Sequence, residues 1–273
     1  MHSKIWKFVL PSYPRKIHLR IKLLYMKILV CISHVPDTTS KINFTDDDTK
    51  FDTNGVQFVI NPNDEFGLTR AMWFKEKQGA NVTVVNVGGP ETEPTLRKAL
   101  AIGADAAVRV NAHPKDGIFV AKQLAKVMQD GNYDLVIAGR ESIDYNGGMV
   151  PGMMAALTDS NFVNTCIDLE VEGSNATAIR EIDGGKETVS TSLPLIIGGQ
   201  KGLVEESELR IPNMRGIMQA RQKPLTVVEP TSDNAATNSI KFEKPAEKGA
   251  VKLVSPDNID ELVSLLHNEA KVI

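Results

Sequence analysis

A glycine-rich stretch follows an apolar run near the middle of the chain. Leu135–Ala138 is apolar, Gly139–Gly148 is polar and rich in glycine, and Met149–Leu157 has the composition of a helix. A strand, a glycine-rich turn and a helix in this order leave unpaired backbone N–H groups at the helix start, where the helix dipole favours negative charge. The stretch therefore predicts a binding site for a phosphate-bearing ligand.

The residues of this stretch also allow a plainer interpretation. Their spacing matches neither the dinucleotide pattern G-x-G-x-x-G nor the P-loop pattern that ends in Gly-Lys-Ser/Thr. The pairs Asn146-Gly147 and Gly147-Gly148 are ordinary turn sequences. On its residues alone, the stretch is either a phosphate loop or a simple turn between strand and helix.

The composition excludes several classes of function. The chain has 273 residues, 42% hydrophobic and 24% charged, with a net charge of −3, which is typical of a globular protein without a general nucleic-acid footprint. Cys31 and Cys166 lie far apart in apolar runs, so we expect buried thiols rather than a disulfide framework or a metal site. The sequence contains no evident nucleophile–base pair or paired carboxylates, so we expect no catalytic site in this chain.

Residues 1–25 differ from the rest, because they contain six lysines and arginines and no acidic residue. They are a mitochondrial-type transit segment, a basic tail, or an extension before a start at Met26. We favour the last, because Met26–Ile32 resembles the opening strand of a domain. This choice predicts a cytoplasmic protein, whereas a transit segment would direct the chain to the mitochondrial matrix. We expect no membrane insertion, because no apolar run is long enough.

Apolar strands and helices alternate over the first half of the chain. Apolar strands without polar alternation, joined by helices, predict a doubly wound α/β domain with a Rossmann-like parallel sheet, which binds ligands at the carboxyl ends of its strands. Asn61 or Asn63 is available to cap the first helix. The predicted strands are Lys27–Ser33, Val82–Val87, Ala106–Val110 and Leu135–Ala138, and the helices are Pro62–Gln78, Pro90–Leu100, Gly117–Met128 and Met149–Leu157.

The second half has a different character. Ile167–Glu172, Ala176–Glu181 and Thr188–Ser192 are predicted short strands joined by glycine-containing turns, which form an antiparallel extension of the same sheet or a separate domain. A strand at Leu195–Ile197 and a helix at Pro212–Arg221 follow. We place one domain at residues 26–229. Residues 230–273 form a C-terminal arm with a terminal helix at Asn258–Ala270, which either docks on another surface or folds back on its own domain.

Three sequence motifs carry a resemblance to a known family. Ala178–Val189 followed by Pro194–Ile197 resembles the signature of the electron transfer flavoprotein beta subunit, as does Ala99–Asp105. Gly139–Asp144 is similar to the opening of that family's nucleotide loop. The resemblance extends in order from Met26 to Glu229.

The resemblance implies a specific function. It implies a heterodimer with an alpha subunit that carries electrons between dehydrogenases and an acceptor, with the redox-active FAD mainly on the alpha subunit. It implies that the beta subunit binds AMP, or a second FAD, in its own nucleotide site. The other hypothesis is a stand-alone adenine-nucleotide-binding module or ATP-using enzyme on a similar fold.

The resemblance also assigns site residues. It implies that Cys31 and Val87 pack near the adenine, and that Asn61 and Asp64 bond adenine or ribose hydroxyls unless they simply cap the helix. Asp144 is assigned to loop shape or to ribose, because a carboxylate repels phosphate. The backbone from Asn146 to Gly152 is expected to cradle the phosphate. The complete set is Cys31, Asn61, Pro62, Asn63, Asp64, Val87, Asp144, Tyr145, Asn146, Gly147, Gly148, Met149, Val150, Pro151 and Gly152.

The chain departs from the family pattern at three places, one of which is Ser33-His34, where the family commonly has a basic residue. Tyr145–Gly152 lacks most of the hydroxyl and amide side chains of the family's loop, and Pro151 removes one backbone N–H. The loop Gly202–Arg210, which matches the family's docking loop for an acyl-CoA or other dehydrogenase, is acidic here. An acidic loop indicates a different redox partner or docking by charge complementarity.

Overall fold

The computed structural model describes residues 25–231, 234–246 and 249–273. The basic extension proposed for residues 1–25 lies outside this part of the chain, apart from Tyr25. The chain divides into two compact units. Residues up to Ser40 and Gly55–Asn238 form the first, and Lys41–Asn54 and Ser239–Ile273 form the second.

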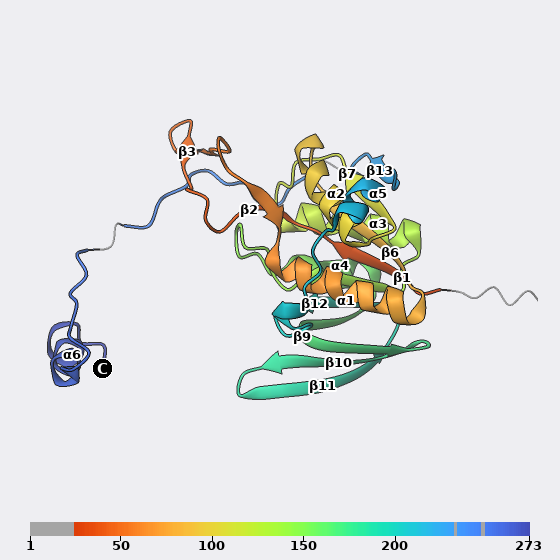
Figure 1. Cartoon of the computed structure of the whole chain (residues 1–273). Coiled ribbons are helices and arrows are strands. Elements are labelled where there is room, and N and C mark those ends of the chain that lie inside the picture. Colours follow the sequence, from red (N-terminus) through yellow and green to blue (C-terminus); the bar gives the residue numbers. More distant parts are fainter. Residues whose placement is uncertain (1–24, 232–233, 247–248) are drawn as a thin grey trace, which may run out of the picture. The chain divides into compact units, whose positions relative to one another are not determined.

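One sheet of nine strands, counted within the described residues, forms the first unit (Figure 1). Its order is β11-β10-β9-β12-β8-β1-β6-β7-β13. Every neighbouring pair is parallel except β10 with β9 and β10 with β11. The strands are β1 (Lys27–Cys31), β6 (Asn81–Val87), β7 (Ala106–Val110), β8 (Leu135–Gly139), β9 (Asn161–Glu172), β10 (Asn175–Ile182), β11 (Gly185–Ser192), β12 (Leu195–Gly199) and β13 (Leu225–Val228).

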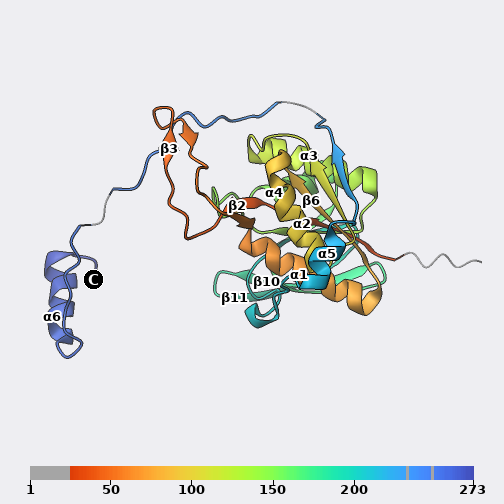
Figure 2. The same cartoon turned by 45° about the horizontal axis from the view of Figure 1, so that its top comes forward.

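Helices cover both faces of the parallel part of the sheet (Figures 1 and 2). In β1, Ile28 and Val30 join the core cluster that includes α1 (Pro62–Gln78) and α2 (Glu93–Ile102), whereas Leu29 and Cys31 join the cluster that includes α3 (Gly117–Gly131) and α4 (Val150–Thr158). Burial on both faces explains the continuous apolar strands and confirms the doubly wound class. The helices are α1 (Pro62–Gln78), α2 (Glu93–Ile102), α3 (Gly117–Gly131), α4 (Val150–Thr158) and α5 (Met214–Ala220), with 3-10 turns η1 (Pro90–Thr92) and η2 (Glu206–Glu208).

Most predicted elements are present, and the main differences concern one helix, the antiparallel strands and one edge strand. The predicted helix at Pro90 begins as the 3-10 turn η1 and becomes α-helical only at Glu93. The three predicted short strands are longer and extend the same sheet, which is one of the two arrangements expected for them. The edge strand β13 is absent from the sequence prediction, because Leu225–Val228 is a run of only four residues. Pairing with β7, rather than local sequence, makes it a strand.

The second unit joins two segments that are distant in sequence. Its hairpin consists of β3 (Phe44–Thr45) and β4 (Lys50–Phe51), and the ring of Phe44 stacks on that of Phe242 with centroids 5.0 Å apart. The Phe242 N–H donates to the Asp48 carbonyl at 2.8 Å. This grouping was not expected from the sequence, and the sequence boundary between residues 229 and 230 stays a prediction.

The C-terminal helix also belongs to the second unit. It comprises α6 (Ile259–Ser264) and a π-helical turn, η3 (Leu265–Glu269), which agrees with the predicted helix. In the first unit, the segment after β1 adds a small ladder of β2 (His34–Pro36) with β5 (Phe58–Ile60). Among the helices of the described residues, none is long and apolar enough to cross a membrane.

Candidate functional site

The order of the strands creates a switch point between β1 and β8. The chain runs outward from β1 through β6 to β7 and then returns to β8 on the opposite side of β1. Loops that follow β1 and β8 therefore leave the sheet in different directions. In doubly wound sheets this divergence opens a crevice at the carboxyl ends of the strands, where ligands bind. The predicted segments after β1 and β8 lie at this point.

The Asp64 carboxylate bridges the ends of these two strands. β1 and β8 pair only as far as Val30 and Ile137. Beyond that pair, the Ser33 N–H donates to Asp64 Oδ2 at 2.7 Å, and the Gly139 N–H donates to Asp64 Oδ1 at 2.9 Å. Asp64 is 2% exposed, so both hydrogen bonds are shielded from water. A charged acceptor strengthens such bonds.

The Asn61 side chain holds the loop that follows β8. Its Nδ2 donates to the Glu141 carbonyl at 2.9 Å, and its Oδ1 accepts the Ile143 N–H at 3.2 Å. Asn63 Nδ2 donates to the same Glu141 carbonyl at 3.2 Å. Asn61 occupies the N-cap position of α1 but makes no side-chain capping bond, so the predicted cap is wrong. The Asn61 amide binds the backbone of the loop after β8 instead of the N–H groups at the start of α1.

Burial shifts the proton affinities of two groups at this point. Loss of water raises the pKa of Asp64 to about 7, although the hydrogen bonds from Ser33, Asn61 and Gly139 act in the opposite direction. Burial also raises the pKa of the Cys31 thiol, with a smaller contribution from the negative charge of Asp64. The thiol is therefore neutral, which agrees with the buried structural cysteine expected there. Cys166 is buried as well.

Cys31 and Val87 lie at the carboxyl ends of β1 and β6 and are nearly buried, with exposed fractions of 7% and 6%. Both belong to the core cluster that includes α3 and α4. Their positions therefore fit the predicted place at the strand ends, and their packing also fits an ordinary core role. Their contact with an adenine stays a prediction.

The glycine-rich loop folds mainly on itself. The Ser142 N–H donates to the Gly147 carbonyl at 3.2 Å, which closes a short turn. Asp144 Oδ1 accepts the Ser142 hydroxyl at 2.6 Å and the Tyr145 N–H at 2.9 Å, so Asp144 shapes the loop, one of the two roles assigned to it. Asn146 has a φ of 50°, in the left-handed region. Tyr145 and Met149 are exposed at the tip.

The loop leads directly into α4. This helix begins at Val150 with Met149 at its N-cap position, and Met149 makes no side-chain capping bond. Pro151 is buried in the first turn and contributes no N–H. The first residue of α3, Gly117, lies close to Met149. A Cβ atom added to Gly117 would be only 2.6 Å from the Met149 sulfur. An anion at this place would be held by the remaining backbone N–H groups rather than by hydroxyl side chains.

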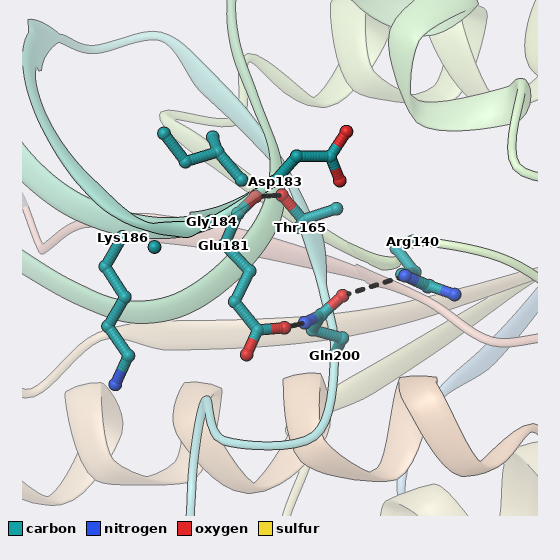
Figure 3. A pocket seen from close by; sticks show the side chains of 9 residues that line it. Arg140, Thr165, Glu181, Asp183, Gly184, Lys186 and Gln200 are labelled. Carbon is teal, nitrogen blue, oxygen red and sulfur yellow. Dashed lines mark hydrogen bonds between the residues drawn. The ribbon is translucent and has the colours of Figure 1, made fainter.

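A hollow of about 570 Å³ lies next to this loop (Figure 3). It is lined by residues from the carboxyl ends of β8 and β12 and from the β10–β11 turn. Gln200 Oε1 accepts from Arg140 Nη1 at 3.2 Å, and Gln200 Nε2 donates to Glu181. Thr165, with a φ of 51°, donates its hydroxyl to the Glu181 carbonyl at 2.7 Å. Lys186 supplies a second cation.

The sequence did not predict this hollow as a site. In the sequence, Arg140 and Glu181 stand out only as members of family motifs, and Gln200 does not stand out. The available signal was that Arg140 directly follows one apolar strand and Gln200 follows another. Their proximity requires β8 and β12 to be neighbours, which the local pattern does not reveal. Among the described residues, no cluster of three or more His, Cys, Asp or Glu side chains offers a metal site.

The acidic loop after β12 has a buried base and an exposed rim. Leu203 and Val204 are 1% and 3% exposed and pack in the first core cluster. Glu205, Glu206 and Glu208 are exposed, and Lys201 pairs with Glu206 at 2.7 Å. Leu203 and Val204 therefore anchor this loop to the domain, and the acidic side chains form its outer surface.

Fold and site together define a doubly wound α/β protein of the Rossmann-like class, with its polar loops gathered at the switch point. A family model described as "Electron transfer flavoprotein domain" matches residues 48–233. The electron transfer flavoprotein subunit beta of Bacillus subtilis is 36% identical over 262 residues, which are 91% of this chain and 100% of that protein. The chain therefore belongs to the electron transfer flavoprotein family, as a relative of its beta subunits.

Two further relatives support the same assignment. The electron transfer flavoprotein subunit beta of Syntrophomonas wolfei is 31% identical over 252 residues, 90% of this chain and 98% of that protein. The human subunit beta is 30% identical over 257 residues, 90% of this chain and 99% of that protein. The match extends over nearly the whole of each relative, so the expected family resemblance is confirmed.

Proposed function

We propose that this chain is the beta subunit of a heterodimeric electron transfer flavoprotein that carries electrons between dehydrogenases and an acceptor. In this proposal, the redox-active FAD lies mainly on an alpha subunit, and the chain described here binds AMP, or a second FAD, in its own nucleotide site. The chain acts as a carrier subunit and contributes no catalytic residues.

The observation that supports the nucleotide site is the convergence of three distant segments at the switch point. Asp64 joins the ends of β1 and β8, and Asn61 joins the start of α1 to the loop after β8. Along the chain, Ser33 and Asp64 are 31 residues apart, and Asn61 and Glu141 are 80 residues apart. Their meeting at the carboxyl edge of a doubly wound sheet is the arrangement that such folds use for nucleotides.

The residues present have the chemistry for a nucleotide. Cys31 and Val87 would offer small apolar surfaces to the adenine, and the backbone from Asn146 to Gly152 would donate to the phosphate. Tyr145 is 69% exposed and has an aromatic face available to a ligand. Because one phosphate group needs few donors, this loop favours AMP over the longer FAD.

Cofactor content tests this proposal. We expect acid release from the heterodimer, purified after co-expression with its alpha subunit, to yield one FAD and one AMP. Two FAD per heterodimer would overturn the choice of AMP and leave the electron carrier intact. A flavin-free chain that purifies alone and turns over ATP would overturn the carrier and support the adenine-nucleotide enzyme instead.

We also propose that the acidic rim of Gly202–Arg210 docks the electron-donating dehydrogenase, an acyl-CoA dehydrogenase or another. The buried Leu203 and Val204 fix the loop, and the exposed carboxylates favour a partner with a basic surface.

The exposed apolar side chains of the terminal helix support a contact with the alpha subunit. Ile259, Leu262 and Val263 are 66%, 44% and 49% exposed. We propose that they bind the alpha subunit, because an apolar stripe on a helix gains stability only when another surface covers it.

A further inference from the structure

The polar atoms of Asn61 and Asp64 are engaged by other groups of the protein. The Asn61 amide binds the loop after β8, and the Asp64 carboxylate accepts from the N–H groups of Ser33 and Gly139 and from Asn61. The two side chains are 1% and 2% exposed. A residue that binds a ligand directly must present an atom to it, and these two present theirs to the protein.

The contacts of Asn61 imitate those of a neighbouring strand. A strand pairs by donating to one carbonyl and accepting one N–H, and the Asn61 amide does the same with the Glu141 carbonyl and the Ile143 N–H. Asn63 adds a second donor to the Glu141 carbonyl. Side chains at the start of α1 therefore hold the loop backbone at Glu141 and Ile143, just before Asp144.

The contacts of Asp64 fix the distance between the ends of β1 and β8. Past the last pair of β1 with β8, the strand ends diverge, and one carboxylate spans the gap between the Ser33 and Gly139 N–H groups. The Gly139 backbone also lies very close to the Asp64 carboxylate. A Cβ atom added to Gly139 would be only 2.3 Å from Asp64 Oδ1. Glycine is required there by this close approach.

We propose that Asn61 and Asp64 are positioning residues of the nucleotide site, which set the loop Gly139–Ile143 and the ends of β1 and β8 in the geometry that a nucleotide requires, without touching it. This inference rests on the proposed nucleotide function. It replaces the direct bonds to adenine or ribose that the resemblance implied for these two residues.

The charge state of Asp64 matters for this role. The carboxylate accepts both N–H groups, whereas the neutral acid keeps one good acceptor and must place its own O–H. Around it, the Cys31 thiol is neutral, Glu65 on α1 pairs with Lys98, and Arg140 pairs with Glu141 on the loop. Nucleotide affinity should therefore increase as Asp64 ionises, with the pKa near 7 placing this change between about pH 6 and 8.

Calorimetric titration of AMP into the full chain tests the proposal. We expect Asp64→Asn and Asn61→Ala each to weaken AMP binding about tenfold or more at pH 8, because each leaves backbone groups of the site unpaired. Gly139→Ala, which keeps the carboxylate but crowds it, should weaken binding similarly. Glu65→Gln is the matched control on the same helix and should bind AMP like the wild type.

The pH profile separates positioning from mere stability. The ratio of wild-type to Asp64→Asn affinity should decrease as the pH is lowered from 8 to 6. The AMP phosphate titrates in both proteins and cancels from this ratio. Unchanged affinities in folded Asp64→Asn, Asn61→Ala and Gly139→Ala chains, or a ratio independent of pH, would overturn the proposal.

Hydrogen exchange keeps the inference testable if the nucleotide function fails. In the ligand-free chain, we expect the Gly139 amide in Asp64→Asn and the Ile143 amide in Asn61→Ala to exchange at least tenfold faster than in the wild type. A wild type that binds neither AMP nor FAD would overturn the proposed nucleotide function. Unchanged exchange at both amides would overturn the positioning role separately.

Discussion

The Asp64 carboxyl group has opposite effects on the site and on the stability of the fold. The ionised form pairs with two backbone N–H groups, yet its burial is costly, which is why its pKa rises to about 7. Sequence reasoning placed Asp64 in the site but assigned its bonds to a ligand or a helix cap. The residue type of Asp64 indicated a role in the site, but its hydrogen-bond partners could not be predicted. These partners are the N–H groups of Ser33 and of Gly139, which lies 75 residues later.

The raised pKa predicts how stability depends on pH. The unfolded carboxyl ionises near its ordinary pKa of 3.8, whereas the folded one stays protonated until about pH 7. The folded state therefore binds more protons across this window, and the contribution of Asp64 to the free energy of unfolding decreases as the pH rises, by at most about 1.4 kcal/mol per pH unit.

Urea unfolding of the full chain between pH 4.5 and 8 checks this prediction. The difference in unfolding free energy between the wild type and Asp64→Asn should decrease with rising pH and level off above pH 7. His34, whose pKa is lowered mainly by burial, titrates in both proteins and cancels. Parallel stability curves for the two proteins would contradict the assignment.

Elements whose ends are marked by flanking residues agree best with their predictions. The bounds of α1 and β7 match the predicted bounds, because Pro62 and Gly79 frame the helix and Asp105 precedes a short apolar run. The edge strand β13 was missed, because its pattern is weak and its partner β7 decides its conformation. Local sequence therefore predicts the bounds of an element well when residues at its ends mark where it starts and stops.

The acidic loop allows a prediction at the scale of one element. Replacing Glu205, Glu206 and Glu208 together by glutamine should raise the KM for an acyl-CoA dehydrogenase several-fold and flatten the dependence on salt, with kcat unchanged. The physical reason is that exposed rim charges mainly steer association. Steady-state reduction of the heterodimer at increasing ionic strength is the measurement.

A buried residue of the same loop provides the control. Leu203→Ala removes a side chain from the core, so it should lower the free energy of unfolding by about 2 to 5 kcal/mol and leave the salt dependence in place. If the triple glutamine variant kept the wild-type KM at every salt concentration, the docking role of this loop would be wrong.

At the scale of the whole molecule, two units of different character share one chain. The first has a sheet with two apolar cores, whereas the second consists of a hairpin, an extended segment and a helix with exposed apolar side chains. A unit with so little buried surface of its own is the part of the chain that we expect a partner to stabilise.

Removal of apolar side chains from the terminal helix tests that expectation. Leu262→Asp with Val263→Asp should weaken association with the alpha subunit about tenfold, measured by analytical ultracentrifugation of the co-expressed subunits. Asp260→Asn, on the same helix, is the matched control. Unchanged association would instead support an arm that folds back on its own domain.

The sequence by itself determined the alternation of strands and helices, the doubly wound class, the family and the segments that meet at the switch point. These depend on periodic burial and on motifs, which are local properties. Only the tertiary structure decided that Asn61 binds the loop after β8, that Asp64 bridges β1 and β8, and that Arg140, Gln200 and Glu181 surround one hollow. Such contacts depend on which strands are neighbours, and strand order arises from packing of the whole chain rather than from any local pattern.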